Sequence, residues 1–155
     1  MPQGPPTDAD FEECSSLIDA WLAGQLSGNP AVLAVEVDDE SGERRWFVRL
    51  QGEEKSVFTV WVHLRQRNLH VETYLMPAPE EREAELYEYL LRRSLHLDGM
   101  SFAIGDEDGI FILGQTPLER VDDDELDRLV GTLYDLTERT FRPAMRIGFA
   151  SKFKG

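Results

Sequence analysis

The sequence predicts an α+β domain, in which an antiparallel β-sheet is flanked by three helices in the order α-β-β-β-β-α-β-β-α. Two observations lead to this class. Short runs of alternating apolar and polar residues, separated by polar turns, are typical of antiparallel strands. The helical segments are grouped around these runs rather than alternating with them, which favours an α+β sheet over a doubly wound parallel one.

The first predicted element is a helix that ends near Gly28. Thr7 or Asp8 can cap its beginning, and Asn29 and Pro30 prevent its continuation. Its apolar stripe consists of Phe11, Cys14, Leu17, Ile18, Trp21 and Leu22. Residues 1–6 are Pro-rich and are predicted to be disordered. No internal repeat or linker follows, so residues 7–155 are predicted to form one domain.

Four strands are predicted next, at residues 31–37, 44–50, 57–64 and 69–75, and turns at 38–42, 51–55 and 66–68 join them into a meander. In the first strand Leu33, Val35 and Val37 share one side. In the second strand the apolar face consists of Trp46, Val48 and Leu50. In the third strand it consists of Phe58, Val60, Val62 and Leu64.

A second helix begins near Glu80 and Glu81, after a Pro-containing break, and is predicted to end at Gly99. Its buried side is predicted to consist of Leu86, Tyr87, Leu90, Leu91 and Leu95. Two further strands, near 101–104 and 110–113, flank a turn at 105–109.

Thr116, Pro117 and Glu119 match a capping box with proline at the first helical position, which predicts a short helical turn. A third long helix opens at residues 122–125, and Pro143 is expected to stop or kink it. The apolar stripe of this helix consists of Leu126, Leu129, Val130, Leu133, Leu136 and Phe141.

The composition excludes some classes of function. The net charge of −14 argues against nucleic-acid binding, because phosphates would be repelled. No apolar stretch is long enough to span a membrane, and no signal-peptide pattern opens the chain. The single cysteine, Cys14, rules out an intrachain disulfide and is predicted to be buried. These features predict a cytoplasmic protein.

Positive charge is concentrated in a basic C-terminal tail, residues 142–155. The tail contains Arg142, Arg146, Lys152 and Lys154. It could fold back onto the acidic body or contact an acidic partner.

Three groups of residues could carry chemistry. The acidic residues 106–108 lack the ligand spacing of a calcium loop and are interpreted as a hairpin turn. The acidic residues 122–125 are interpreted as helix capping. His63 and His70 face each other if residues 57–64 and 69–75 form a hairpin, but the spacing supplies no third metal ligand. No catalytic residue, metal site or cofactor is therefore predicted. The alternative is a small-ligand or metal-binding domain, or an enzyme, with a pocket near His63, His70 and Glu72.

The candidate site is the side of the sheet opposite the apolar core, here called the outer face. It is predicted to contain Arg45, Phe47, Arg49, Thr59, Trp61, His63, His70, Glu72 and Tyr74. Burial of a large apolar side chain contributes about 1.5–3 kcal/mol, so three exposed aromatic rings would forgo several such contributions. Three coverings stay open: the chain's own third helix or basic tail, a second copy, or a client protein.

Several segments together resemble bacterial YbjN-domain proteins, with the actinobacterial branch most similar. They are residues 46–50, 51–55, 74–80, 90–93, 102–106, 113–118 and 141–149. The resemblance runs from about Leu33 to the C-terminus. It implies a fold like that of type III secretion chaperones, often dimeric, and a chaperone-like or regulatory role without catalytic residues. The implied partner is a protein client or a second copy. Nothing in the sequence suggests a secretion apparatus, so a secreted effector is not the expected client.

Overall fold

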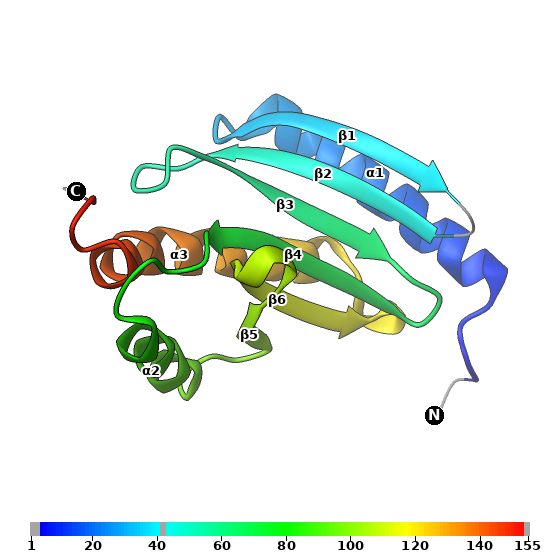
Figure 1. Ribbon diagram of the computed structural model, residues 1–155. Helices are drawn as coiled ribbons and strands as arrows, with labels where there is room; N and C mark the ends of the chain where they lie inside the picture. The colour runs from blue at the N-terminus through cyan, green and yellow to red at the C-terminus, as the bar shows by residue number, and fades with distance from the viewer. Residues whose placement is uncertain (1–3, 41–42, 154–155) are drawn as a thin grey trace.

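The computed structural model describes residues 4–40 and 43–153 (Figure 1). Its helices and strands, in chain order, are α1 (Asp8–Gly28), β1 (Val32–Glu40), β2 (Glu43–Gln51), β3 (Val57–Leu64), β4 (Asn68–Met76), α2 (Glu83–Ser94), β5 (Met100–Ile104), β6 (Ile110–Pro117) and α3 (Asp123–Gly148). The strands form one antiparallel sheet in the order β1-β2-β3-β4-β6-β5. The predicted class and element order are confirmed.

Helices α1 and α3 lie on the same face of the sheet, behind the strands in Figure 1. On this face Trp46 Nε1 of β2 donates a hydrogen bond of 2.8 Å to Asp19 Oδ1 of α1. The ring of Phe58 in β3 packs against Tyr134 of α3 at a centroid distance of 5.5 Å. Within the described part of the chain, no helix is both long and apolar enough to cross a membrane.

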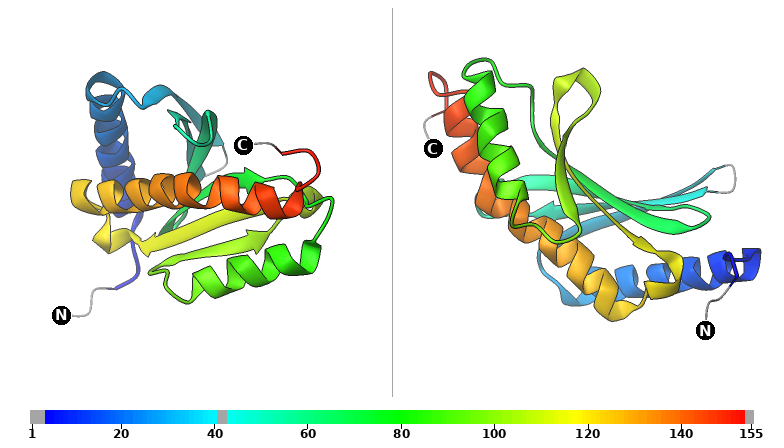
Figure 2. Two further views of the ribbon diagram at one scale, coloured as in Figure 1. Left: turned by 90° about the vertical axis from the view of Figure 1, so that its left-hand side faces the viewer. Right: turned by 90° about the horizontal axis from the view of Figure 1, so that it is seen from below.

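Helix α2 lies away from α1, beside β5 and against α3 (Figure 2). The sheet is strongly twisted, so the β5–β6 hairpin stands at a steep angle to β1 and β2 in the same figure. The short turns η1 (Asp106–Asp108) and η2 (Leu118–Arg120) follow β5 and β6. The acidic residues 106–108 therefore form the tip of a hairpin, as the flanking apolar runs predict.

The core follows the predicted alternation of β2 and β3. Trp46, Val48 and Leu50 are buried, as are all four even-numbered apolar residues of β3. In the register Trp46 lies opposite Val62, and Val62 lies opposite Val71, so one face of three neighbouring strands is predominantly apolar. This face packs against α1 and α3.

The ends of α1 are formed by the predicted residues. Asp10 N–H donates to Thr7 Oγ1 at 3.2 Å, and Thr7 N–H donates to Asp10 Oδ2 at 2.8 Å, which is a reciprocal capping box. Asn29 caps the C-terminal end through a 2.8 Å hydrogen bond from its N–H to Gln25 O. Residues 4–6 precede this helix. The rest of the segment predicted to be disordered, residues 1–3, lies outside the described residues.

Pro143 lies inside α3, and the helix continues to Gly148, so the expected stop is wrong. A proline in a helix interior costs about 3 kcal/mol. Tertiary contacts beyond it offset this cost: Ala144 and Gly148 are buried, and the N–H groups of Glu80 and Glu81 donate to Gly148 O at 3.0 and 3.1 Å. Residues 142–148 of the predicted basic tail are therefore helical.

The predicted short helical turn is present as η2, but Thr116 does not cap it. Strand β6 continues through Pro117 and the 3₁₀ turn begins at Leu118, so Thr116 caps no helix. Its Oγ1 donates instead to Glu125 Oε2 of α3 at 2.6 Å. The hydroxyl is satisfied by a residue nine positions away, which the local capping pattern does not reveal.

Helix α2 is shorter than predicted, since it begins at Glu83 and ends at Ser94. Leu86 and Leu90 are buried as expected, but Leu91 is 71% exposed and Leu95 is 82% exposed, so their predicted burial is wrong. The helix touches α3 and β5 along one narrow side only, and Leu95 lies beyond its last residue. A further difference occurs in β1, where the register shifts between Val32 and Ala34 and leaves Leu33 exposed.

Candidate functional site

The structure brings all the predicted residues of the outer face together on the side of the sheet that faces away from α1 and α3. Phe47 lies opposite Trp61, and Trp61 lies opposite Glu72. In the row on one side of this, Arg45 lies opposite His63, and His63 lies opposite His70. In the row on the other side, Arg49 lies opposite Thr59. Because directly opposed residues in antiparallel strands point to the same side, these rows form a continuous surface.

The aromatic side chains of this surface are half-buried. Phe47 and Trp61 lie next to each other across β2 and β3, and Tyr74 packs edge-on against Phe111 of β6 at a centroid distance of 5.4 Å. Among the described residues, no α-helix lies in front of β2 and β3 in Figure 1, whereas the turn η1 at the tip of the β5–β6 hairpin is drawn in front of β4.

The first of the three possible coverings, the chain's own third helix or basic tail, is not seen among the described residues. Helix α3 packs on the opposite face through Tyr134 and Phe58. In the tail, Phe153 packs against Phe141 of α3 at 6.1 Å, and Lys152 Nζ pairs with Glu80 at 2.6 Å. Lys154 lies outside the described residues. The described part of the tail, residues 142–153, therefore folds back onto the body.

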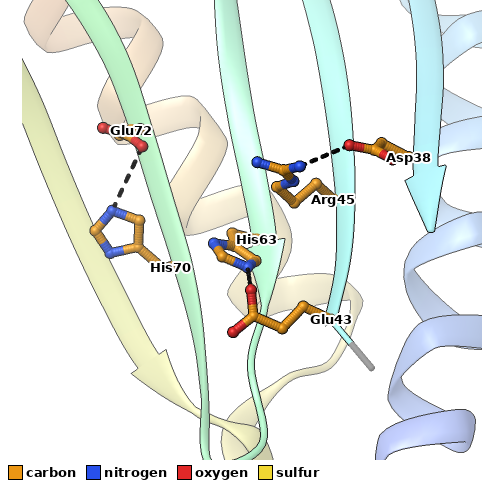
Figure 3. A network of polar contacts seen from close by, with 6 residues as sticks. All are labelled: Asp38, Glu43, Arg45, His63, His70 and Glu72. Atoms are coloured by element: carbon orange, nitrogen blue, oxygen red, sulfur yellow. Dashed lines mark hydrogen bonds and ion pairs between the residues drawn. The ribbon is translucent and has the colours of Figure 1, made fainter. Parts of the chain in front are cut away.

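The polar side chains of the outer face contact one another in pairs (Figure 3). Arg45 pairs with Asp38 of β1 at 2.7 Å, and His63 Nε2 pairs with Glu43 Oε2 at 2.7 Å. His70 Nε2 lies 4.0 Å from Glu72 Oε1. Burial lowers the pKa of His70, and this outweighs the opposing effect of the Glu72 charge. At neutral pH His70 is therefore uncharged.

His63 and His70 face each other as predicted, but they do not form a metal site. Each imidazole contacts a different carboxylate, and Figure 3 shows the rings turned to separate partners. In the described part of the chain, no three His, Cys, Asp or Glu side chains are placed to hold a metal ion together. The structure offers no observation that favours the metal-binding alternative.

The structure adds residues to the outer face that sequence reasoning missed. Glu36 lies opposite Phe47, and Asp38 lies opposite Arg45. On the other side Leu113 lies opposite Glu72, and Phe111 lies opposite Tyr74. Glu36 and Asp38 alternate with valines, which is a usable signal for a second face. In β6 both faces are apolar, so its sequence does not reveal which residues point outward.

Lys55, in the turn between β2 and β3, makes contacts that its sequence context does not predict. Its Nζ donates to the main-chain oxygens of Tyr74 and Leu75, and it lies 5.2 Å from the Tyr74 ring centre and 5.5 Å from that of Phe141. Burial lowers the pKa of Lys55 to about 8. This lysine ties the turn to the end of β4, next to the outer face.

The face that packs against the helices contains a cavity of about 320 Å³ between α1 and α3. Val32, Val48 and Leu50 form much of its lining, and Trp21 Nε1 donates to Asp127 Oδ1 at 2.9 Å across the two helices. Asp127 is the one carboxylate among its described lining residues. Tyr134 is the other titratable side chain among them.

The six-stranded antiparallel sheet with its three helices is the fold of the type III secretion chaperones. The structure is similar to a chain in the HopA1–SchA chaperone–effector complex, with a TM-score of 0.59 and 17% identity, covering 89% of this chain and 99% of that one. It is also similar to a chain in the complex of the Yersinia pestis chaperone SycH with a fragment of YscM2, with a TM-score of 0.54 and 17% identity, covering 83% and 98%.

The chain belongs to the YbjN family, whose model matches residues 30–145 and is described as "Putative bacterial sensory transduction regulator". An uncharacterized protein of Mycobacterium tuberculosis is 29% identical over 107 residues, which are 69% of this chain and 58% of the relative. One of Mycobacterium leprae is 28% identical over 113 residues, 73% of this chain and 61% of the relative. The chain thus matches about three fifths of these relatives' length. The resemblance noted in the sequence is confirmed.

Proposed function

We propose that the protein is a non-enzymatic, chaperone-like or regulatory protein-binding module of the bacterial cytoplasm, and that its outer face binds a segment of a client protein or a second copy. One observation carries this proposal. Phe47, Trp61 and Tyr74 lie together on a sheet face that no α-helix of the described residues covers. Contiguous apolar surface rimmed by polar groups is typical of protein interaction sites.

The energetics favour an occupant on this surface. Aromatic rings contribute large buried areas to interfaces, and Trp and Tyr are enriched among the residues that dominate binding energy. The neighbouring Arg45–Asp38 and His63–Glu43 pairs form a polar rim around the rings. An aromatic centre with a polar rim is the usual composition of a protein–protein interface.

The comparisons support the same class of function. Both structures of similar fold were determined as complexes with a protein partner, an effector in one and a fragment of YscM2 in the other. The family description points to regulation, which also acts through binding partners. These similarities support protein binding in general and leave the partner of this chain to experiment.

The test is crosslinked capture from the native host, analysed by mass spectrometry, with wild type and Trp61→Ala/Tyr74→Ala in parallel. Leu91→Ser/Leu95→Ser is the matched control, because it also removes two large apolar side chains from a surface, but on α2. Circular dichroism and thermal unfolding verify that each variant is folded. Thr59→Arg is a second variant of the outer face, which adds bulk without removing a ring.

We expect partners to be captured by wild type and by the α2 control, and to be lost with the outer-face variants. Recovery of the protein itself as the sole lost species would identify a second copy as the occupant. If folded Trp61→Ala/Tyr74→Ala and Thr59→Arg both capture the same proteins as wild type, the outer face is not the binding surface.

A further inference from the structure

The outer face has a marked excess of negative charge. Its strand residues and the exposed tip of the β5–β6 hairpin carry seven carboxylates, those of Glu36, Asp38, Glu43, Glu72, Asp106, Glu107 and Asp108. Against these stand three guanidinium groups, those of Arg45 and Arg49 on β2 and that of Arg65 directly after β3, whose charge acts on His70. The negative charge of Glu107 reaches the aromatic part of the face, since it helps burial to raise the pKa of Tyr74.

Two of the carboxylates flank the aromatic pair in a single row across the strands. Glu36 lies opposite Phe47, Phe47 opposite Trp61, and Trp61 opposite Glu72. Glu36 is exposed, and Glu72 Oε1 lies 4.0 Å from Nε2 of the uncharged His70. The row therefore presents a carboxylate, two aromatic rings and a second carboxylate, in that order.

The neighbouring rows differ from this one. On one side Arg45 is already paired with Asp38. On the other side Arg49 faces Ala34 and Thr59, so no carboxylate of the strands compensates its charge there. A cation that approached the Arg49 row would be repelled, whereas the row between Glu36 and Glu72 attracts it at both ends. The charges therefore favour binding of a cationic ligand along the row from Glu36 to Glu72.

The spacing of the row restricts what can fit. Neighbouring strands lie about 4.8 Å apart, so the three steps from Glu36 to Glu72 span about 14 Å. An extended chain advances about 3.4 Å per residue and points every second side chain to the same side. Four residue steps therefore cover the distance, so that residues i and i+4 lie at the two carboxylates and the side chain of residue i+2 lies over the rings. A helix, about 10 Å wide, would also cover the Arg45 and Arg49 rows.

We propose that the partner of the outer face is a basic, extended client segment with the pattern Lys/Arg-x-Φ-x-Lys/Arg, where Φ is apolar. Its two cations lie at Glu36 and Glu72, and its apolar residue lies on Phe47 and Trp61. This inference rests on the proposed function and names the partner's chemistry. A second copy is a poorer occupant, because two chains of net charge −14 repel each other.

The test uses synthetic peptides and nuclear magnetic resonance of the ¹⁵N-labelled protein, which detects weak binding. One peptide has two lysines four positions apart, a leucine midway and serines elsewhere. A second has glutamates in place of the lysines. A third has the same composition as the first but places the lysines three positions apart, which turns them to opposite sides of an extended chain. Each is titrated into wild type and Glu36→Gln/Glu72→Gln. The charge control is Glu12→Gln/Glu119→Gln, at exposed carboxylates off the outer face.

We expect the first peptide to bind wild type and the charge control equally, with shifts in β2 and β3. Glu36→Gln/Glu72→Gln should raise the dissociation constant about three- to tenfold, the effect of losing two exposed ion pairs. The other two peptides should bind more weakly than the first.

Equal binding of the lysine and glutamate peptides, equal binding to Glu36→Gln/Glu72→Gln, or no binding of the first peptide to wild type would overturn the inference. A dissociation constant that rises in Trp61→Ala/Tyr74→Ala but not in Glu36→Gln/Glu72→Gln would leave the proposed aromatic binding face intact and remove only the basic pattern. Binding that is indifferent to both double variants would count against the outer face itself.

Discussion

The carboxylate of Glu138 on α3 lies directly against Gly52 in the turn between β2 and β3. Glu138 Oε2 accepts hydrogen bonds from the main-chain N–H groups of Glu53 at 3.1 Å and Glu54 at 2.6 Å. A methyl group on Gly52 would come within 1.8 Å of Glu138 Oε1 and 2.3 Å of the main-chain oxygen of Lys55. The close approach of α3 to this turn therefore requires glycine.

Gly52→Ala should destabilise the protein by about 2–3 kcal/mol, because a main-chain atom must move to make room for the methyl group. Urea unfolding measures this loss of stability, provided that the dependence of the free energy of unfolding on urea concentration has the same slope in both proteins. Gly24→Ala is the matched control: nothing lies within 4 Å of the added carbon, and alanine is a better helix former, so stability should rise by up to about 1 kcal/mol. A Gly52→Ala midpoint equal to that of wild type would refute the argument.

Glu125→Gln should lower the free energy of unfolding by about 1–2 kcal/mol at neutral pH, since Arg128 and Thr116 both donate to this carboxylate. The Arg128 hydrogen bond, followed by the Thr116 hydrogen bond, lowers the pKa of Glu125 to about 2, against the effect of burial. A depressed carboxyl pKa stabilises the fold above the unfolded value of about 4.5. The difference between wild type and variant should disappear as the pH falls towards 2. A constant difference across acid titration would be inconsistent with this origin.

The Cys14 thiol should react slowly in the folded protein. Burial, aided by the charge of Glu13, raises the pKa of Cys14 to about 11 from 9.0. The thiolate fraction at pH 8 is then about a hundredfold smaller than in the unfolded chain, and iodoacetamide should alkylate the native protein at least that much more slowly. Because the folded state keeps its proton longer, this group's contribution to stability falls as the pH rises from 9 through 11. Cys14→Ala should remove this decline.

Lys55 should change the pH dependence of stability in the direction opposite to that of Cys14. Its pKa is lowered by burial to about 8, so between pH 8 and 10.5 the unfolded chain binds more protons than the folded one. The stability contributed by this group therefore rises with pH across that window. In a Cys14→Ala background, which removes the competing thiol, Lys55→Met should abolish the rise in chemical-denaturation curves. Parallel curves for the two proteins from pH 8 to 10.5 would show that Lys55 titrates normally.

The two sides of α2 should respond differently to substitution. Leu91→Ser/Leu95→Ser should change stability by no more than about 0.5 kcal/mol per site, because both side chains are largely exposed. Leu86→Ala removes a side chain with no exposed surface and should cost about 2–4 kcal/mol. Thermal and urea unfolding of the three proteins give the comparison. A large loss in the Leu91/Leu95 variant would mean that these leucines are covered in the native protein.

The sequence was a good guide wherever one local pattern had one structural solution. The alternation in residues 57–64 predicted the strand and its two faces, and Thr7, one of the two predicted caps, is the N-cap of α1. The outer face was found in the same way, because Trp61 and Phe47 occupy positions of opposite parity to the core. Hairpin geometry then placed His63 opposite His70 without knowledge of the rest of the fold.

It was a poor guide where tertiary contacts choose between equivalent local patterns. Leu90 and Leu91 both have helical partners at the right spacing, but only the position of α3 and β5 decides which side of α2 is covered. Thr116 fits a capping box, yet Glu125 is close enough to take its hydroxyl. Pro143 would end an isolated helix, but buried Ala144 and Gly148 hold the following turns. Strand β6 was predicted as a strand, but its sequence did not indicate which side faces outward, since both its faces are apolar.

The strand order has a consequence for how the chain forms during synthesis. Strands β1 to β4 are joined by adjacent hairpins and can pair as soon as they leave the ribosome, whereas β6, the second neighbour of β4, arrives only after α2 and β5 have been made. Until then β4 is an open edge with unpaired backbone groups, which is the kind of surface that joins growing chains together. The nascent chain therefore passes through an interval in which it needs protection itself, and the length of that interval is set by the roughly forty residues between β4 and the end of β6.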